Sequence, residues 1–119
     1  MPEFRAELSG AIDELTAELK KDLKGVPVEA QDVPLLEDLV ADDPPLSPTI
    51  LGLFRGAPLS EPCAATLTPC RSIVLYRRNL ARAARTREEL NEQVRVTLLH
   101  ELGHLRGEDD DELAARGLE

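Results

Sequence analysis

The chain has few aromatic residues and no long apolar run. Its 119 residues include no tryptophan, one tyrosine and two phenylalanines, so leucine, valine, isoleucine and alanine must form the core. No apolar run reaches the ~18–20 residues that cross a bilayer, so we expect no transmembrane helix and no membrane partner. Residues 1–7 are acidic and follow helical spacing, unlike a signal peptide, so we expect a cytoplasmic protein. The length predicts a single domain over residues 1–119, as a monomer or weak homo-oligomer.

Basic residues are too few to balance the acids. Lysine and arginine total 14 against 23 aspartates and glutamates, which gives a net charge of −9. Such a balance argues against a general nucleic-acid binder, because phosphate binding needs a cationic surface. Residues 71–87 nevertheless hold six arginines and no acid. We interpret that stretch as a solvated face or as partners for acids elsewhere, rather than as a receptor for an acidic ligand.

Cysteine is also scarce. Cys63 and Cys70 are the only two, and their spacing matches neither a zinc ribbon nor a CxxC redox pair. They could close a small disulfide loop. A cytoplasmic protein usually keeps its thiols reduced, so we expect two free thiols.

Apolar spacing predicts the elements of the first two thirds of the chain. A stripe at intervals of three and four residues indicates one long helix over residues 4–23, which Gly25 and Pro27 end. Gly52 lies inside an apolar run and suggests a bulge or a close backbone approach. The predicted strands are residues 26–33, 49–54 and 72–76; the predicted irregular segments are 34–48 and 56–69; short helices are predicted at 79–84 and 111–117.

A second long helix begins at a predicted capping box. Thr86 stands at the N-cap and Glu89 at the third helical position. Gly103 inside this helix costs about 1 kcal/mol relative to alanine, which suggests close packing by a strand or loop. A neighbouring face carries Gln93, Thr97 and both histidines, so we expect the imidazoles to face a cleft. The core stripe is Leu90, Val94, Leu98, Leu102 and Leu105.

Both histidines fall in one eleven-residue stretch that reads HExxHxxGxxD. His100 and His104 lie one helical turn apart on the same face, close enough to share one Zn²⁺. Glu101 is placed to act on zinc-bound water rather than on the metal itself. Gly107 can end the helix and let the chain return an oxygen ligand to the ion. The stretch therefore predicts a zinc site with its own general base.

The motif and two upstream segments resemble the small bacterial zincin-like metallopeptidases. The upstream segments read LGLFRGAPL over residues 51–59 and IVLYRR over residues 73–78. The resemblance covers roughly residues 26–116. HExxH itself is shared by many zincins, whereas the upstream segments are more particular to this family.

The resemblance implies both a site and a fold. His100, His104 and Asp110 would be the Zn²⁺ ligands, and Glu101 would be the general base. The implied fold class is α+β and zincin-like. A small mixed sheet of three to four strands would pack on an N-terminal helix and on the helix that carries the active site.

Two other zincin groups use a different third ligand. The metzincins have a third histidine where this chain has Asp110, and they continue to a methionine turn, whereas the only methionine here is Met1. The gluzincins use a glutamate on a downstream helix, and few residues follow His104. Gly107 favours Asp110 because it supplies the turn. Other acids crowd the same place and can simply mark a solvated helix start: Glu108, Asp109, Asp111 and Glu112.

The predicted reaction is hydrolysis of a peptide bond in a peptide or protein substrate. Glu101 would take a proton from zinc-bound water and later protonate the leaving amine. Residues 49–54 could form an edge strand that pairs with an extended substrate. Tyr76 or an arginine could stabilise the oxyanion, and the sequence does not choose between them.

The sequence is also compatible with two other functions. A non-catalytic, metal-stabilised adaptor or latent enzyme is one, because no substrate cleft can be read from sequence. A metal-dependent endoribonuclease with three histidines at these offsets is the other. Glu101, Asp110 and the net charge weigh against that second alternative, because its substrate is a polyanion.

Overall fold

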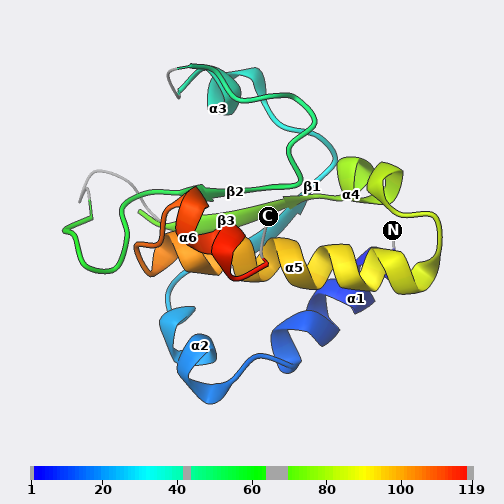
Figure 1. Cartoon of the computed structure of the whole chain (residues 1–119), viewed down its shortest axis with the longest axis horizontal. Helices are drawn as coiled ribbons and strands as arrows, with labels where there is room; N and C mark the ends of the chain where they lie inside the picture. Colours follow the sequence, from blue (N-terminus) through cyan, green and yellow to red (C-terminus); the bar gives the residue numbers. More distant parts are fainter. Residues whose placement is uncertain (1, 42–43, 64–69, 118–119) are drawn as a thin grey trace.

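The computed structural model describes residues 2–41, 44–63 and 70–117, which form an α+β fold (Figure 1). The predicted fold class is confirmed, with a mixed sheet of three strands. The elements in chain order are α1 (Pro2–Asp13), α2 (Ala17–Asp22), β1 (Val28–Gln31), α3 (Leu36–Val40), β2 (Gly52–Arg55), β3 (Ser72–Tyr76), α4 (Arg77–Ala83), α5 (Arg87–Leu105) and α6 (Asp110–Ala115).

Strand β3 is the centre of the sheet. All five of its residues are buried, as its continuous apolar run predicts. β1 pairs with it in parallel, with Val28 opposite Ile73. β2 pairs with it antiparallel, with Gly52 opposite Leu75. Among the described residues β2 has no second neighbour, so its outer side is a sheet edge.

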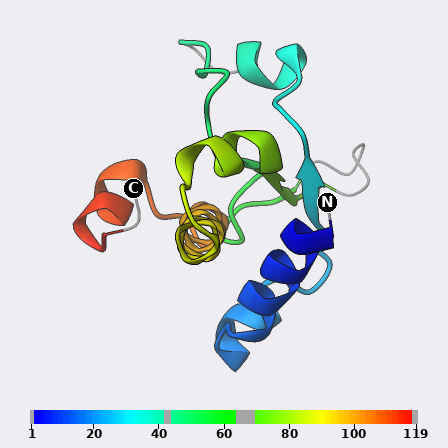
Figure 2. The same ribbon diagram turned by 90° about the vertical axis from the view of Figure 1, so that its right-hand side faces the viewer.

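The core lies between the sheet and α5. Helix α5 runs along one face of the sheet, and α1 packs against α5 (Figures 1 and 2). Ile73 and Leu75 from β3 meet Leu98 and Leu102 from α5, and all four are at most 1% exposed. Helix α3 stands on the opposite side of the sheet from α1 and α2 (Figure 2). No helix in the described part of the chain has the length and apolarity to cross a membrane.

The prediction of one helix over residues 4–23 is wrong, because the chain breaks between α1 and α2. Thr16 is the N-cap of α2, and its hydroxyl accepts a hydrogen bond from the Leu19 amide at 3.3 Å. This local bond competes with continued helix. The apolar stripe continues through the break, since Leu15 and Leu23 still pack against the core. Gly25 ends α2 with a φ of 79°, as expected.

A short helix, α3, lies inside the segment predicted to be irregular. Leu35 at its N-cap makes no side-chain capping bond, and Leu36 is 74% exposed, so neither a cap nor an apolar period marks it. Tertiary contacts hold it instead. Arg55 of β2 donates to Asp38 at 2.5 Å, and the Leu46 amide donates to the Leu39 carbonyl at 2.9 Å.

The expectation of free thiols is wrong in this structure, because Cys63 and Cys70 form a disulfide. The bond closes part of the connection between β2 and β3. Gly56 turns beside it with a φ of 106°, and a Cβ there would stand 2.2 Å from the Cys70 carbonyl oxygen. Arg71 also holds this connection, by donating to the backbone carbonyls of residues 57, 58 and 61. Residues 64–69 of the predicted loop lie outside the described residues.

Candidate metal centre

Helix α5 sets the two histidines one turn apart. Thr86 caps it by accepting from the Glu89 amide at 3.1 Å, whereas the Glu89 carboxylate accepts from Arg85, so only half of the predicted box forms. The buried stripe of α5 faces the sheet and α1, which turns His100 and His104 toward a cavity. Their ring centroids lie 4.8 Å apart, and their Nε2 atoms lie 3.2 Å apart.

Asp110 joins the histidines from the first turn of α6. Its Oδ1 lies 3.0 Å from His104 Nε2 and 3.5 Å from His100 Nε2. The chain reaches this position through Gly107, which has a φ of 93°. Among the acids considered from sequence, Asp110 is therefore the one whose oxygen meets both rings.

These three atoms suit a zinc ion. Two ligands at about 2.0–2.1 Å from a tetrahedral zinc are about 3.3–3.4 Å apart, and the three separations here are 3.0, 3.2 and 3.5 Å. Two imidazoles and one carboxylate also form a donor set that catalytic zinc uses. His100, His104 and Asp110 thus fit the ion in both chemistry and spacing.

A backbone contact orients one of the imidazoles. His104 Nδ1 lies 2.9 Å from the carbonyl oxygen of Glu108, which can only accept, so Nδ1 carries the proton and donates it. The Nε2 lone pair is then directed at Asp110 and His100, where a metal would lie. The backbone carbonyl of Glu108 therefore orients His104. The sequence did not indicate this role, because Glu108 is one of several neighbouring acids there.

The neighbouring acids have structural roles that sequence reasoning did not separate. Asp109 caps α6 and forms a reciprocal capping box with Glu112. Glu108 pairs with Arg116. Gly103 is closely packed, as predicted, but its neighbour is Leu113 of helix α6 and not a strand or loop. A Cβ at Gly103 would stand 2.2 Å from Leu113 Cδ2. The packing of Leu113 on Gly103 holds α6 against α5, while the other two contacts hold together the turn and helix that carry Asp110.

Glu101 is buried beneath strand β2. The residue is only 6% exposed, and burial raises the pKa of its carboxyl from 4.5 to about 7. The charge of Asp110 acts in the same direction, whereas His100 and a hydrogen bond with the Phe54 backbone lower the pKa. One carboxylate oxygen of Glu101 and one imidazole nitrogen each of His100 and His104 lie within 4.8 Å of one another.

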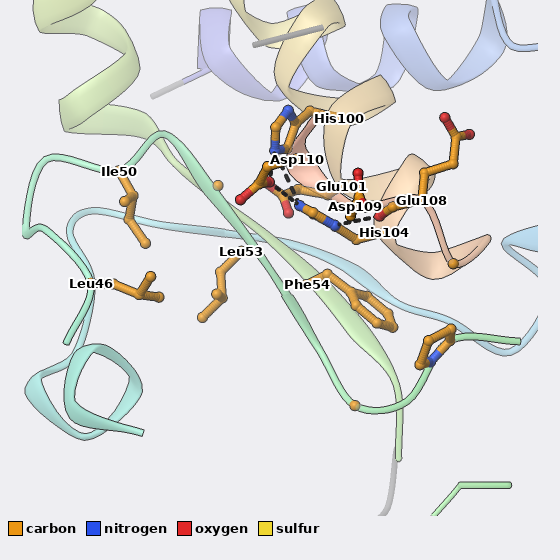
Figure 3. Close-up of a pocket in the computed structure, with 14 residues that line it drawn as sticks. Leu46, Ile50, Leu53, Phe54, His100, Glu101, His104, Glu108, Asp109 and Asp110 are labelled. Atoms are coloured by element: carbon orange, nitrogen blue, oxygen red, sulfur yellow. Dashed lines mark hydrogen bonds and ion pairs between the residues drawn. The ribbon is translucent and has the colours of Figure 1, made fainter. Parts of the chain in front are cut away.

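A cavity of about 500 Å³ opens in front of these groups. His100, Glu101, His104 and Asp110 line it on the side of α5 and α6, and β2 supplies the opposite side (Figure 3). Neither Tyr76 nor an arginine lines it. Tyr76 is fully buried within the sheet, so neither of the two sequence candidates for an oxyanion group faces the cavity.

The arginine stretch mostly has structural partners. Arg77 pairs with Asp32, and Arg87 pairs with Glu7 at 3.6 Å. Arg71 binds backbone carbonyls, as described above. The interpretation of these arginines as partners for acids elsewhere in the fold is confirmed for Arg77 and Arg87.

Fold and site together define the class of the protein. A helix that presents two histidines with a buried glutamate, set under an edge strand and completed by a carboxylate beyond a glycine turn, is the arrangement of a metal-dependent hydrolase. The family described as zincin-like metallopeptidase matches residues 23–118, and the chain belongs to that family. No curated protein shows significant similarity to the chain. Membership supports a metallopeptidase in general, with a metal that is typically zinc.

Proposed function

We propose that the protein is a zinc-dependent metallopeptidase that hydrolyses peptide bonds, with Glu101 as general base. The observation that carries this proposal is the convergence of three donor atoms within 3.5 Å of one another, beside a buried carboxylate and at an open cavity. His100, His104 and Asp110 would hold the ion. A zinc ion there would act as a Lewis acid, polarising the scissile carbonyl and making water a better nucleophile.

The residues around the ion supply the proton transfers. Glu101 in its carboxylate form accepts a proton from the attacking water, whose oxygen adds to the carbonyl carbon. Glu101 then donates that proton to the leaving nitrogen as the C–N bond breaks. The Phe54 backbone, which is hydrogen-bonded to Glu101, keeps the carboxyl turned toward the cavity. The raised pKa of Glu101 suits a group that must both take and return a proton near neutral pH.

The free edge of β2 offers a place for an extended substrate. Residues 52–54 border the cavity, and β2 pairs only with β3 among the described residues. A peptide laid along this edge would use the same backbone bonds as an added strand, with its carbonyl groups near Glu101. This arrangement favours a peptide or protein over other hydrolysable substrates.

The cavity also argues against the two alternative functions, a non-catalytic adaptor and an endoribonuclease. A non-catalytic adaptor needs no hollow that connects the metal donors with solvent, whereas this one is large enough for several substrate atoms. An endoribonuclease would need basic side chains to hold phosphates, and the described residues that line this cavity include no lysine or arginine. Both observations favour the peptidase.

Compartment and assembly do not follow from the site. The cytoplasmic location stays a prediction, and the disulfide between Cys63 and Cys70 weighs against it because such bonds persist mainly in oxidising compartments. A monomer or weak homo-oligomer likewise stays a prediction.

The proposal is tested by peptide-library hydrolysis with zinc-loaded wild type and zinc-loaded Glu101→Gln. We expect the wild type to cleave, and the variant to retain zinc but lose cleavage by at least about a hundredfold, because Glu101 handles protons. Equal cleavage by both proteins would exclude the mechanism. Absence of cleavage by both, across the library, would favour the adaptor.

A further inference from the structure

The cavity has two chemically different walls. The wall formed by α5 and α6 carries the metal donors and acids. The other wall is apolar and includes Leu46, Ile50 and Leu53, which come from β2 and from the segment that leads into it. Figure 3 shows these three side chains gathered on one side of the imidazoles. Each is half-buried, so aliphatic surface lines the hollow and stays open to whatever enters it.

The fold fixes this wall without using the metal site. Asn79 of α4 is 5% exposed, and its side-chain amide donates to the carbonyls of Pro48 at 2.9 Å and Ile50 at 2.8 Å. The Leu46 amide donates to the carbonyl of the buried Leu39 at 2.9 Å. A buried side-chain amide that donates both of its hydrogen bonds to one irregular segment holds that segment in a single position. The wall is therefore a formed surface rather than a loose loop.

We propose that Leu46, Ile50 and Leu53, together called the apolar wall, select substrates with a bulky apolar side chain next to the scissile bond. This inference rests on the proposed peptidase function. The apolar wall and Glu101 line one continuous cavity, so a residue whose carbonyl lies at Glu101 has its neighbouring side chain within reach of the wall. The occupant is thus the substrate itself.

Charge on the opposite wall sharpens the selection. Asp109, whose charge is balanced neither by the proposed ion nor by Arg116, lines the same cavity. An acidic side chain would lose water against the apolar wall and meet negative charge across from it. An aliphatic or aromatic side chain instead covers the exposed leucine and isoleucine surface. We expect a preference of at least about tenfold for leucine or phenylalanine over glycine, and a larger one over aspartate.

Three substitutions test the apolar wall, and a fourth is the control. Leu46→Ser and Leu53→Ser remove apolar surface from the cavity. Leu46→Asp adds charge and should shift the preference toward lysine or arginine, a change that simple loss of folding cannot produce. Leu36→Ser makes the same exchange on α3, at a residue that is 74% exposed and does not line the cavity, and should leave the preference unchanged.

The experiment uses zinc-loaded full-length protein and a randomised octapeptide library, with the residues at cleaved bonds identified by mass spectrometry. We expect cleavage beside leucine, isoleucine, phenylalanine or methionine, with about tenfold loss of that preference in Leu46→Ser and Leu53→Ser. Cleavage without side-chain preference, or an unchanged preference in both serine variants, would overturn the inference while leaving the peptidase function standing.

A binding measurement separates this inference from hydrolysis. Zinc-loaded wild type is titrated with N-acetyl-leucinamide and, in parallel, with N-acetyl-aspartamide, while NMR follows the methyl groups of Leu46, Ile50 and Leu53. Shifts of these methyls with the leucine compound alone support the apolar wall even when no peptide is cleaved. Equal shifts with both compounds, or none with either, contradict it.

Discussion

Gly52 lies directly against Glu101 where β2 meets α5. A Cβ at Gly52 would stand 3.1 Å from Glu101 Oε2 and 2.7 Å from Thr97 Cγ2. The missing side chain lets the edge strand approach the helix closely enough to bury the carboxyl, while Glu101 still borders the cavity. Contact between these two residues therefore sets the environment of the proposed general base.

Substitution of Gly52 by alanine should destabilise the protein. The added methyl group has no room between Thr97 and Glu101, and overpacking of this kind costs about 1–3 kcal/mol. Gly10→Ala is the matched control, because nothing lies within 4 Å of a Cβ at that helical position and alanine should be neutral or stabilise by up to about 1 kcal/mol. Urea denaturation measures both. Equal free energies of unfolding for the two variants would refute the close approach.

Gly103→Ala should weaken zinc binding although it alters no donor atom. Its Cβ would stand 2.2 Å from Leu113 Cδ2, so Leu113 must move, and because Leu113 is fully buried we expect α6 to shift with it and carry Asp110 along. Adding Leu113→Ala to Gly103→Ala removes the clash and should restore part of the affinity, a coupling that a double-mutant cycle detects. Competition with a zinc chelator provides the measurement. Purely additive effects would show that Gly103 does not position α6.

Asp110→Ala should reduce zinc affinity more than a change at any neighbouring acid. We expect a loss above about 100-fold, because even residues that only support a ligand cost 10–100-fold. Asp111→Ala is the clean control. Asp109→Ala should fall between the two, since it removes the N-cap of α6, an effect of about 1 kcal/mol. The same chelator titration applies, and greater sensitivity at Asp111 would reassign the third ligand.

The metal-free protein should lose stability as pH rises from about 4.5 to about 7. Burial raises the pKa of Glu101 from 4.5 to about 7, so the folded state keeps a proton that the unfolded chain has released. The contribution is fully present below 4.5 and is lost by about 7, a change of roughly 3 kcal/mol. Glu101→Gln should remove this part of the pH dependence. Parallel stability curves for wild type and variant would contradict it.

Local sequence signals predicted the part of the fold that carries the site. Thr86 marks the start of α5, the histidine spacing gives a shared face, and Gly107 gives the turn to Asp110. Each of these signals involves residues only a few positions apart, so periodicity and capping rules can recognise it from the sequence. The position of β3 was also predicted, because a fully buried strand has a continuous apolar run.

Other features depend on contacts between distant segments. Helix α3 is held by Arg55 and Asp38, 17 positions apart, and its own sequence carries no cap or apolar period. The approach of Gly52 to Glu101 likewise joins two elements that no local pattern relates. The break at Thr16 was hidden because the apolar stripe continues across it. The disulfide was missed because the expected compartment outweighed the short spacing of the two cysteines.

The position of a bound zinc ion is the most direct test of the proposed metal site. Full-length protein crystallised with zinc is measured by anomalous diffraction at the zinc edge. We predict one ion at about 2.0–2.2 Å from the Nε2 atoms of His100 and His104 and from an Asp110 oxygen, with its remaining position open to the cavity and Glu101 outside its coordination. An ion held by Glu101 in place of Asp110, or no ion between the two imidazoles, would contradict it.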